Sequence, residues 1–185
     1  MKNNLRGFTL IELILAISLM AITFTVTSDI LISLIKSQSK TQVMNNVEEQ
    51  ASFIMTRIEN DLRNAGGAYL TNDGDNTGLT IQNQTTKGEV GYYIGGAGST
   101  VDDKGLYYWY GGDITKVVEL TDRTDPGGVR AACPEDGGCF SVSEGTPQVV
   151  NVSIRFTPSS LTSSSSPVNL GVIEMNDTIV IRGSY

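Results

Sequence analysis

The sequence predicts an α+β fold, with a long N-terminal helix that is half membrane-spanning and half packed on a head of antiparallel β-strands. Three observations predict it. An apolar run begins at Phe8, neither glycine nor proline occurs from Phe8 to Ala65, and 19 of the 20 glycines and all five prolines follow Ala65. Because glycine and proline disfavour helix interiors and favour turns, the 185 residues divide into a helical part and a turn-rich part.

The first element is residues 8–28, FTLIELILAISLMAITFTVTS, preceded by a short segment that carries Lys2 and Arg6. As a helix these 21 residues span about 31 Å, close to the thickness of a bilayer's hydrocarbon core. Basic residues before a span favour the cytoplasmic side, so we expect a single pass with the first residues in the cytoplasm and the head on the other side of the membrane. The run is compatible with a cleaved signal peptide, a permanent anchor, or a processed anchor that keeps its apolar stretch.

Glu12 lies inside this apolar run. A carboxylate there costs about 2.5 to 3.5 kcal/mol on insertion scales and commonly marks a function or a partner. The apolar region of a signal peptide avoids such a charge, and no clear A-x-A cleavage pattern follows the run. The alternative is a tolerated carboxylate that snorkels to the cytoplasmic interface.

Residues 6–12, Arg-Gly-Phe-Thr-Leu-Ile-Glu, resemble the processing site of type IV pilins and type II secretion pseudopilins. The resemblance implies that prepilin peptidase cleaves between Gly7 and Phe8, that residues 1–7 are a leader peptide, and that the new amino terminus of Phe8 is methylated. It also implies that Glu12 of an incoming subunit pairs with the Phe8 amine of its neighbour during assembly. Such an amine is mostly cationic at neutral pH, because α-amino groups titrate at about pH 8.

The second half of the helix, residues 29–65, is predicted to be an amphipathic continuation. Its apolar residues recur in steps of three and four, which defines one helix face: Val43, Val47, Ala51, Ile54, Ile58, Leu62 and Ala65. A coiled-coil stalk is disfavoured because no strict heptad is sustained. Gly66 and Gly67 are predicted to stop the helix, with Arg63 favourably placed in the last turn.

The helix end, residues 57–66 (RIENDLRNAG), resembles the corresponding segment of PilW-type minor pilins. GspJ-type pseudopilins share the Asp-Leu-Arg run, and the following Ala-Gly favours PilW. The resemblance implies the pilin fold. Asp29 and the absence of a helix-kinking proline depart from the common pattern of major pilins.

The head, residues 66–185, is predicted to be β-rich because short apolar runs alternate with Gly, Asn and Asp clusters. We expect strands at 78–82, 89–94, 105–110, 114–120, 139–142, 149–157 and 174–182. The serine-rich stretch 159–167 is expected to be a surface loop. Tyrosines and Trp109 gather in the second and third of these strands, where cross-strand packing is the ordinary explanation and an exposed aromatic surface the alternative.

Cysteine and acidic residues give the remaining candidate sites in the head. Cys133 and Cys139 flank a turn sequence in a region expected to be oxidising, which favours a disulfide. Asp73 and Asp75 superficially resemble a calcium loop, but too few charged ligands follow, so an Asx-rich turn is favoured. No other metal site and no cofactor is expected, since the sequence has no histidine and only two cysteines.

Charge and composition disfavour several function classes. The first 65 residues carry six Lys/Arg and six Asp/Glu, whereas the remaining 120 carry seven and fourteen, so the net charge of −7 belongs to the head. An acidic head is not expected to bind nucleic acid. The absence of histidine, and of any Ser or Cys nucleophile motif, disfavours an enzyme.

The sequence therefore predicts a structural protein similar to PilW-type minor pilins, which primes or tips a type IV filament. The expected partners are prepilin peptidase, membrane lipid, the inner-membrane assembly platform, other minor pilins and the major pilin. A GspJ-like pseudopilin is the leading alternative, a major pilin is the next, and a membrane-anchored binding protein that never polymerises represents a different class.

Overall fold

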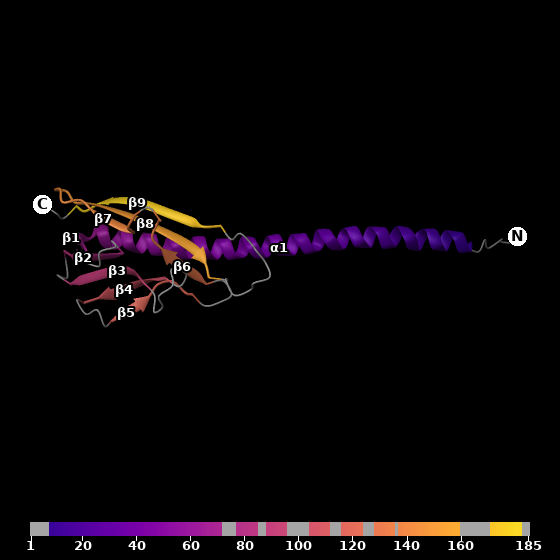
Figure 1. The fold of residues 1–185 in the computed structure, drawn as a ribbon, viewed down its shortest axis with the longest axis horizontal. Helices are drawn as coiled ribbons and strands as arrows, with labels where there is room; N and C mark the ends of the chain where they lie inside the picture. Colours follow the sequence, from indigo (N-terminus) through magenta and orange to yellow (C-terminus); the bar gives the residue numbers. More distant parts are fainter. Residues whose placement is uncertain are drawn as a thin grey trace, which may run out of the picture. The chain divides into compact units, whose positions relative to one another are not determined.

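The computed structural model describes residues 8–71, 77–84, 88–95, 104–111, 116–123, 128–135, 137–159 and 171–182. The chain divides into two compact units, a first unit of Met1–Gln42 and a second unit of Val43–Tyr185. A long N-terminal helix and two antiparallel β-sheets make up the described residues (Figure 1), which confirms the predicted α+β fold.

Helix α1 comprises Leu10–Arg63. It ends two residues before the predicted Ala65, because Ala65 already pairs with Asn83 in a β-ladder. Asn64 continues the helical hydrogen bonding, since its N–H donates to the carbonyl of Asn60 at 3.3 Å. The Arg63 side chain bonds Glu59 one turn earlier, which places a cation in the last turn, as predicted.

The first sheet is a five-stranded meander in the order β1-β2-β3-β4-β5. Its strands are β1 (Ala65–Leu70), β2 (Gly78–Asn83), β3 (Glu89–Gly95), β4 (Gly105–Tyr110) and β5 (Val117–Glu119). Strand β1 was not predicted, because its Gly-Gly pair is typical of a helix stop. The ladder accommodates that pair with an irregularity between Ala65 and Gly67.

The second sheet is built around its longest strand, β8 (Val149–Pro158). Strands β6 (Val129–Ala132) and β7 (Phe140–Val142) pair with opposite ends of β8, and β9 (Ile173–Val180) pairs with most of its length. Strand β6 was also not predicted, since a four-residue segment containing an arginine carries too little periodicity. The other strands lie where they were expected, although β5 is shorter than the predicted 114–120.

The core of the second unit forms where α1 packs against both sheets. Five of the seven residues of the predicted apolar helix face are fully buried: Val47, Ala51, Ile54, Ile58 and Leu62. Of the other two, Val43 is only partly buried and Ala65 is buried as the first residue of β1. Alternate residues of β8 are buried beside them. Burying five such side chains supplies the hydrophobic free energy that fixes this part of the helix on the sheets, at roughly 1.5 to 3 kcal/mol for each large one.

A disulfide and a pair of side-chain hydrogen bonds hold strand ends in place. The predicted disulfide joins Cys133 and Cys139, whose Cα atoms lie 4.7 Å apart. A loop of this size contributes about 2 to 2.5 kcal/mol by the chain-entropy relation. Gln148 also bridges the two sheets, because its side-chain oxygen accepts from the Ala68 N–H at 3.1 Å and its amide donates to the Ala68 carbonyl at 3.4 Å.

Candidate functional site

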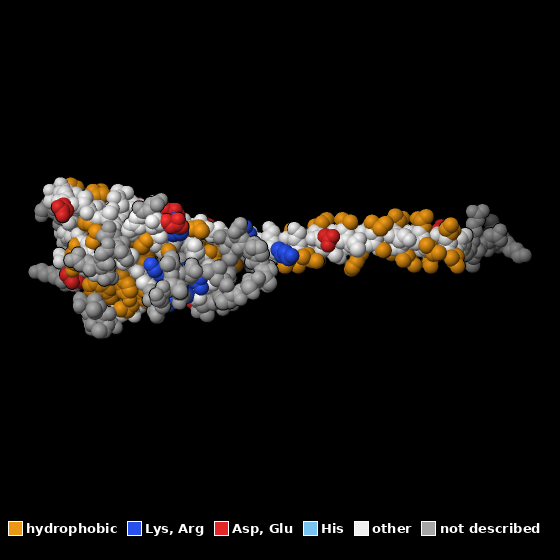
Figure 2. All heavy atoms as spheres, in the orientation of Figure 1, with side chains coloured by type: hydrophobic (Ala, Val, Ile, Leu, Met, Phe, Trp, Pro, Cys, Tyr) orange, Lys and Arg blue, Asp and Glu red, His pale blue; other side chains and the backbone are white. Residues whose placement is uncertain are grey.

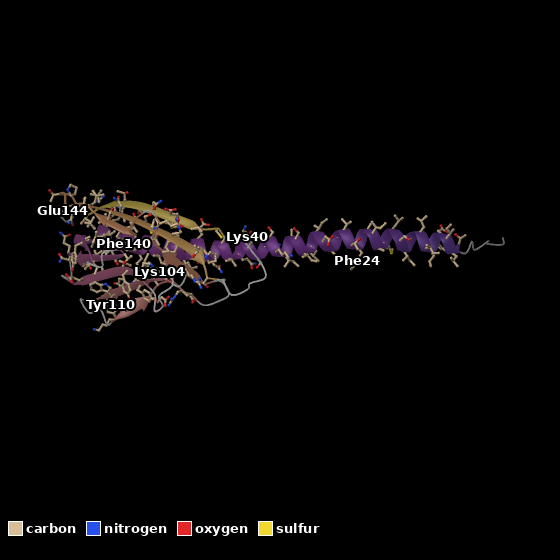
Figure 3. The ribbon with its side chains drawn as sticks, in the orientation of Figure 1. Phe24, Lys40, Lys104, Tyr110, Phe140 and Glu144 are labelled. Atoms are coloured by element: carbon tan, nitrogen blue, oxygen red, sulfur yellow. A yellow bond between two sulfur atoms is a disulfide. The ribbon has the colours of Figure 1, made fainter. Side chains whose placement is uncertain are left out.

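The candidate site is the apolar segment, defined here as residues 8–35, in the first unit. Its large apolar side chains are all more than half exposed, from 80% at Phe8 to 51% at Ile32. Figure 2 shows orange apolar side chains around this part of α1, and Figure 3 shows Phe24 among side chains that project away from the helix. Such a surface is stable only when lipid or other protein helices cover it.

Five hydroxyl side chains within the apolar segment have hydrogen-bond partners in the helix itself. Five hydroxyls donate to backbone carbonyls one turn earlier, at 2.7 to 3.1 Å: Ser18, Thr23, Thr25, Thr27 and Ser28. A hydroxyl with an internal partner does not need water, so these residues do not prevent entry into an apolar medium. The most apolar 18-residue window of α1 has a mean hydropathy of 2.2, and α1 is long and apolar enough to cross a membrane.

Glu12 lies in the first turn of α1. The Thr9 carbonyl accepts hydrogen bonds from the N–H groups of Glu12 and Leu13 at 3.1 and 3.3 Å, so the helix begins immediately after Thr9. A carboxylate near a helix N-terminus interacts favourably with the helix dipole. The Glu12 carboxylate has no hydrogen bond or ion pair with any residue that the structure describes.

The start of the chain carries a known sequence signature. Residues 2–28 match the family model described as the prokaryotic N-terminal methylation motif. This is a type IV pilin-like prepilin signal, and it includes Gly7, Phe8 and Glu12. Comparisons with curated proteins and with solved structures give no match. The motif and the apolar helix together fit membrane anchoring and a protein similar to type IV pilins or pseudopilins.

A polar cluster in the second unit joins α1 to the first sheet. The hydroxyl of the buried Tyr92 donates to the Asp61 carboxylate at 2.5 Å. One helical turn before Asp61, the Arg57 guanidinium lies 4.1 Å from the centre of the Tyr108 ring, which is a cation–π contact. Burial of Tyr92 and its bond to Asp61 raise the pKa of the Tyr92 hydroxyl. The cluster is thus a structural connection between helix and sheet.

Sequence reasoning did not find this cluster. A signal was present, because Arg57 and Asp61 are four residues apart and therefore on one helix face, beside the predicted apolar stripe. The tyrosines themselves were correctly expected to pack across strands: Tyr92 faces Tyr108 with ring centres 5.2 Å apart, and Tyr93 stacks on Tyr107 at 5.1 Å.

The other candidate residues give no further site. Gly7, Asp73 and Asp75 lie outside the described residues, as does most of the serine-rich stretch. Within the described ranges, no three His, Cys, Asp or Glu side chains gather closely enough to hold a metal ion.

Proposed function

We propose that this chain is a PilW-like minor pilin that assembles into a type IV filament. The observation that supports the proposal best is the methylation motif at residues 2–28, which overlaps an exposed apolar helix. A motif of this kind implies processing by prepilin peptidase and assembly with other pilins. The proposed role is structural rather than enzymatic, because the exposed apolar segment can pack against the helices of neighbouring subunits.

The proposed sequence of events follows from the chemistry of the N-terminus. The chain enters the inner membrane once, with Lys2 and Arg6 in the cytoplasm and the second unit in the periplasm. Prepilin peptidase then cleaves between Gly7 and Phe8, and the new amine of Phe8 is methylated but keeps its positive charge. The apolar segment afterwards exchanges lipid for the helices of neighbouring subunits.

In the proposal, Glu12 determines where an incoming subunit binds in the filament. A lone carboxylate and a lone ammonium group are both unfavourable in an apolar medium, whereas a pair of them is much less so. Glu12 of an incoming subunit therefore pairs with the Phe8 amine of the subunit that preceded it. The proposed partners are the assembly platform, other minor pilins and the major pilin, with a role in priming or at the filament tip.

Substitution of Glu12 tests this function. We expect Glu12→Ala and Glu12→Gln chains to be cleaved at Phe8 but to be at least about tenfold depleted from sheared filaments, because one lost charge pair is worth more than about 1.4 kcal/mol in an apolar medium. Glu12→Asp keeps the charge and is the matched control, with partial retention expected. Quantitative immunoblotting of filament and membrane fractions measures the distribution.

Two outcomes would contradict the proposal. If Glu12→Ala enters filaments as well as the unmodified chain, pairing with Glu12 does not drive assembly. If the unmodified chain is never found in filaments and its loss instead abolishes protein secretion, the chain acts as a GspJ-like pseudopilin of a type II secretion system.

A further inference from the structure

Arg130, in strand β6, is a partly buried arginine without a partner in the described part of the chain. It forms no hydrogen bond and no ion pair there. Its Nε atom is buried and has no acceptor, whereas the two terminal nitrogens reach the surface. Buried polar groups normally have partners, and a charged group loses most when it has none. The guanidinium group therefore favours an acceptor that the described chain does not supply.

Arg130 lies on the face of the second sheet that points away from the core. In the β6–β8 ladder (Figure 1), Arg130 pairs with Thr157 and Ala132 pairs with Arg155. The residues that alternate with these four along β6 and β8 are buried, so the four side chains share the other face. Arg130 and Arg155 are diagonal neighbours, and such positions lie about 7 to 8 Å apart, within reach of long side chains. Because Ala132 and Thr157 are small, both guanidinium groups can contact one ligand.

Two carboxylates lie near Arg155 and leave Arg130 uncompensated. The Arg155 Nη1 donates to Glu135 Oε1 at 3.0 Å, but the Glu135 side chain is 85% exposed and such ion pairs contribute little. Glu174 lies opposite Arg155 in the β8–β9 ladder, yet no ion pair joins these two described side chains. The Thr157 hydroxyl has no hydrogen bond in the described chain. Arg130, Arg155 and Thr157 therefore offer donors from two strands on one face.

We propose that Arg130, Arg155 and Thr157 form a binding site for a single phosphate group. Planar guanidinium groups bind phosphate oxygens through charge-assisted hydrogen bonds. A phosphate group presents at least three acceptor oxygens in different directions, so each of the three donors can meet its own oxygen, whereas a carboxylate presents only two in one plane. The net charge of −7 disfavours a nucleic-acid backbone, so the ligand is inorganic phosphate or a phosphate monoester.

Equilibrium dialysis of the purified full-length chain in detergent tests the site. The probe is radiolabelled inorganic phosphate, and chloride keeps the ionic strength constant. We expect saturable binding of one phosphate per chain, and Arg130→Gln should weaken the affinity at least about tenfold, because it removes one guanidinium group. Arg182→Gln is the matched control. Arg182 is exposed and its loss changes the net charge equally, so we expect a change below about twofold.

Glu135→Gln provides a second test, in which the affinity should increase. The substitution frees Nη1 of Arg155 and removes a carboxylate that repels phosphate, so we expect binding to become about two- to fivefold tighter. Arg155→Gln should weaken binding at least about fivefold. A variant that only perturbed the sheet would not strengthen binding, so the gain separates the site from a structural effect.

Three results overturn the proposal: no saturable binding, equal effects of Arg130→Gln and Arg182→Gln, or binding to Glu135→Gln that is unchanged or weaker. The same dialysis with glycerol 3-phosphate identifies the source of the phosphate. Tighter binding of this ester than of inorganic phosphate supports a phosphate carried on a larger molecule, and weaker binding supports free phosphate. None of these measurements depends on filament assembly, so the site is tested separately from the proposed function.

Discussion

Gly91 in β3 lies under the indole ring of Trp109 in β4, its cross-strand partner. A Cβ atom at position 91 would overlap Nε1 and two carbons of that ring, so only glycine fits. We expect Gly91→Ala to reduce the free energy of unfolding by about 1 to 3 kcal/mol, because the ring must move within a packed sheet. Denaturant unfolding in detergent measures this, followed by the fluorescence of the single tryptophan.

Gly137→Ala is the control for Gly91→Ala. Apart from its chain neighbours, no described residue has an atom within 4 Å of a Cβ at Gly137, so a change below about 0.5 kcal/mol is expected. Equal stability of the two variants would show that Trp109 does not constrain position 91.

Tyr92 makes the free energy of unfolding of the second unit depend on pH. Burial, followed by the hydrogen bond and charge of Asp61, raises the pKa of Tyr92 in the folded state. Unfolded tyrosine ionises at about pH 10, so this stabilisation is fully present below about pH 10 and is lost as the pH rises further. We expect Tyr92→Phe to cost about 1 to 2 kcal/mol at pH 7, because the Asp61 carboxylate loses its donor. Unfolding free energies at several pH values measure both effects.

As the pH rises above about 10, the free energy of unfolding should fall less for Tyr92→Phe than for the unmodified chain, because the substituted ring cannot ionise. Tyr110→Phe is the control, since Tyr110 is 47% exposed. Parallel pH curves for the unmodified chain and Tyr92→Phe would contradict the assignment.

The two parts of helix α1 lie in different environments. Two isoleucines, one from each part, test this difference. Ile58 is fully buried in the second unit, whereas Ile30 is 63% exposed in the first. Ile58→Ala should cost about 2 to 5 kcal/mol of unfolding free energy, because it leaves a cavity in the core. Ile30→Ala should leave that free energy unchanged within about 0.5 kcal/mol, as measured by tryptophan fluorescence.

A similar loss of stability for the two alanine variants would contradict the division. Ile30 would then contribute to the same cooperative core as Ile58, although no described side chain buries it.

Among the elements, those with strong periodicity were predictable and those defined by tertiary pairing were not. The helix and its buried face followed from apolar steps of three and four, because one sequence pattern determines one surface. Strand β1 was not predicted, because its Gly-Gly pair taken by itself indicates a turn. The segment becomes a strand only because it pairs with β2. The contacts of Gln148 with Ala68, 80 residues apart, had no local signal at all.

At the scale of the whole molecule, the apolar N-terminal helix was more predictable than the second unit that follows it. Glu12 is conspicuous in sequence because a charge inside an apolar run is costly, and that cost does not depend on tertiary structure. The disulfide also followed from a local turn. The Arg57–Tyr108 and Asp61–Tyr92 contacts required knowledge of which strand faces the helix, which sequence alone does not supply.

The central claim is that the chain is a processed subunit of a filament, and mass spectrometry of sheared, purified filaments tests it most directly. We predict a peptide that begins at a methylated Phe8, at an abundance far below that of the main subunit. Near-equal abundance would make the chain a main building block rather than a minor pilin. Absence from filaments, with residues 1–7 still attached to chains that stay in the membrane, would contradict the claim.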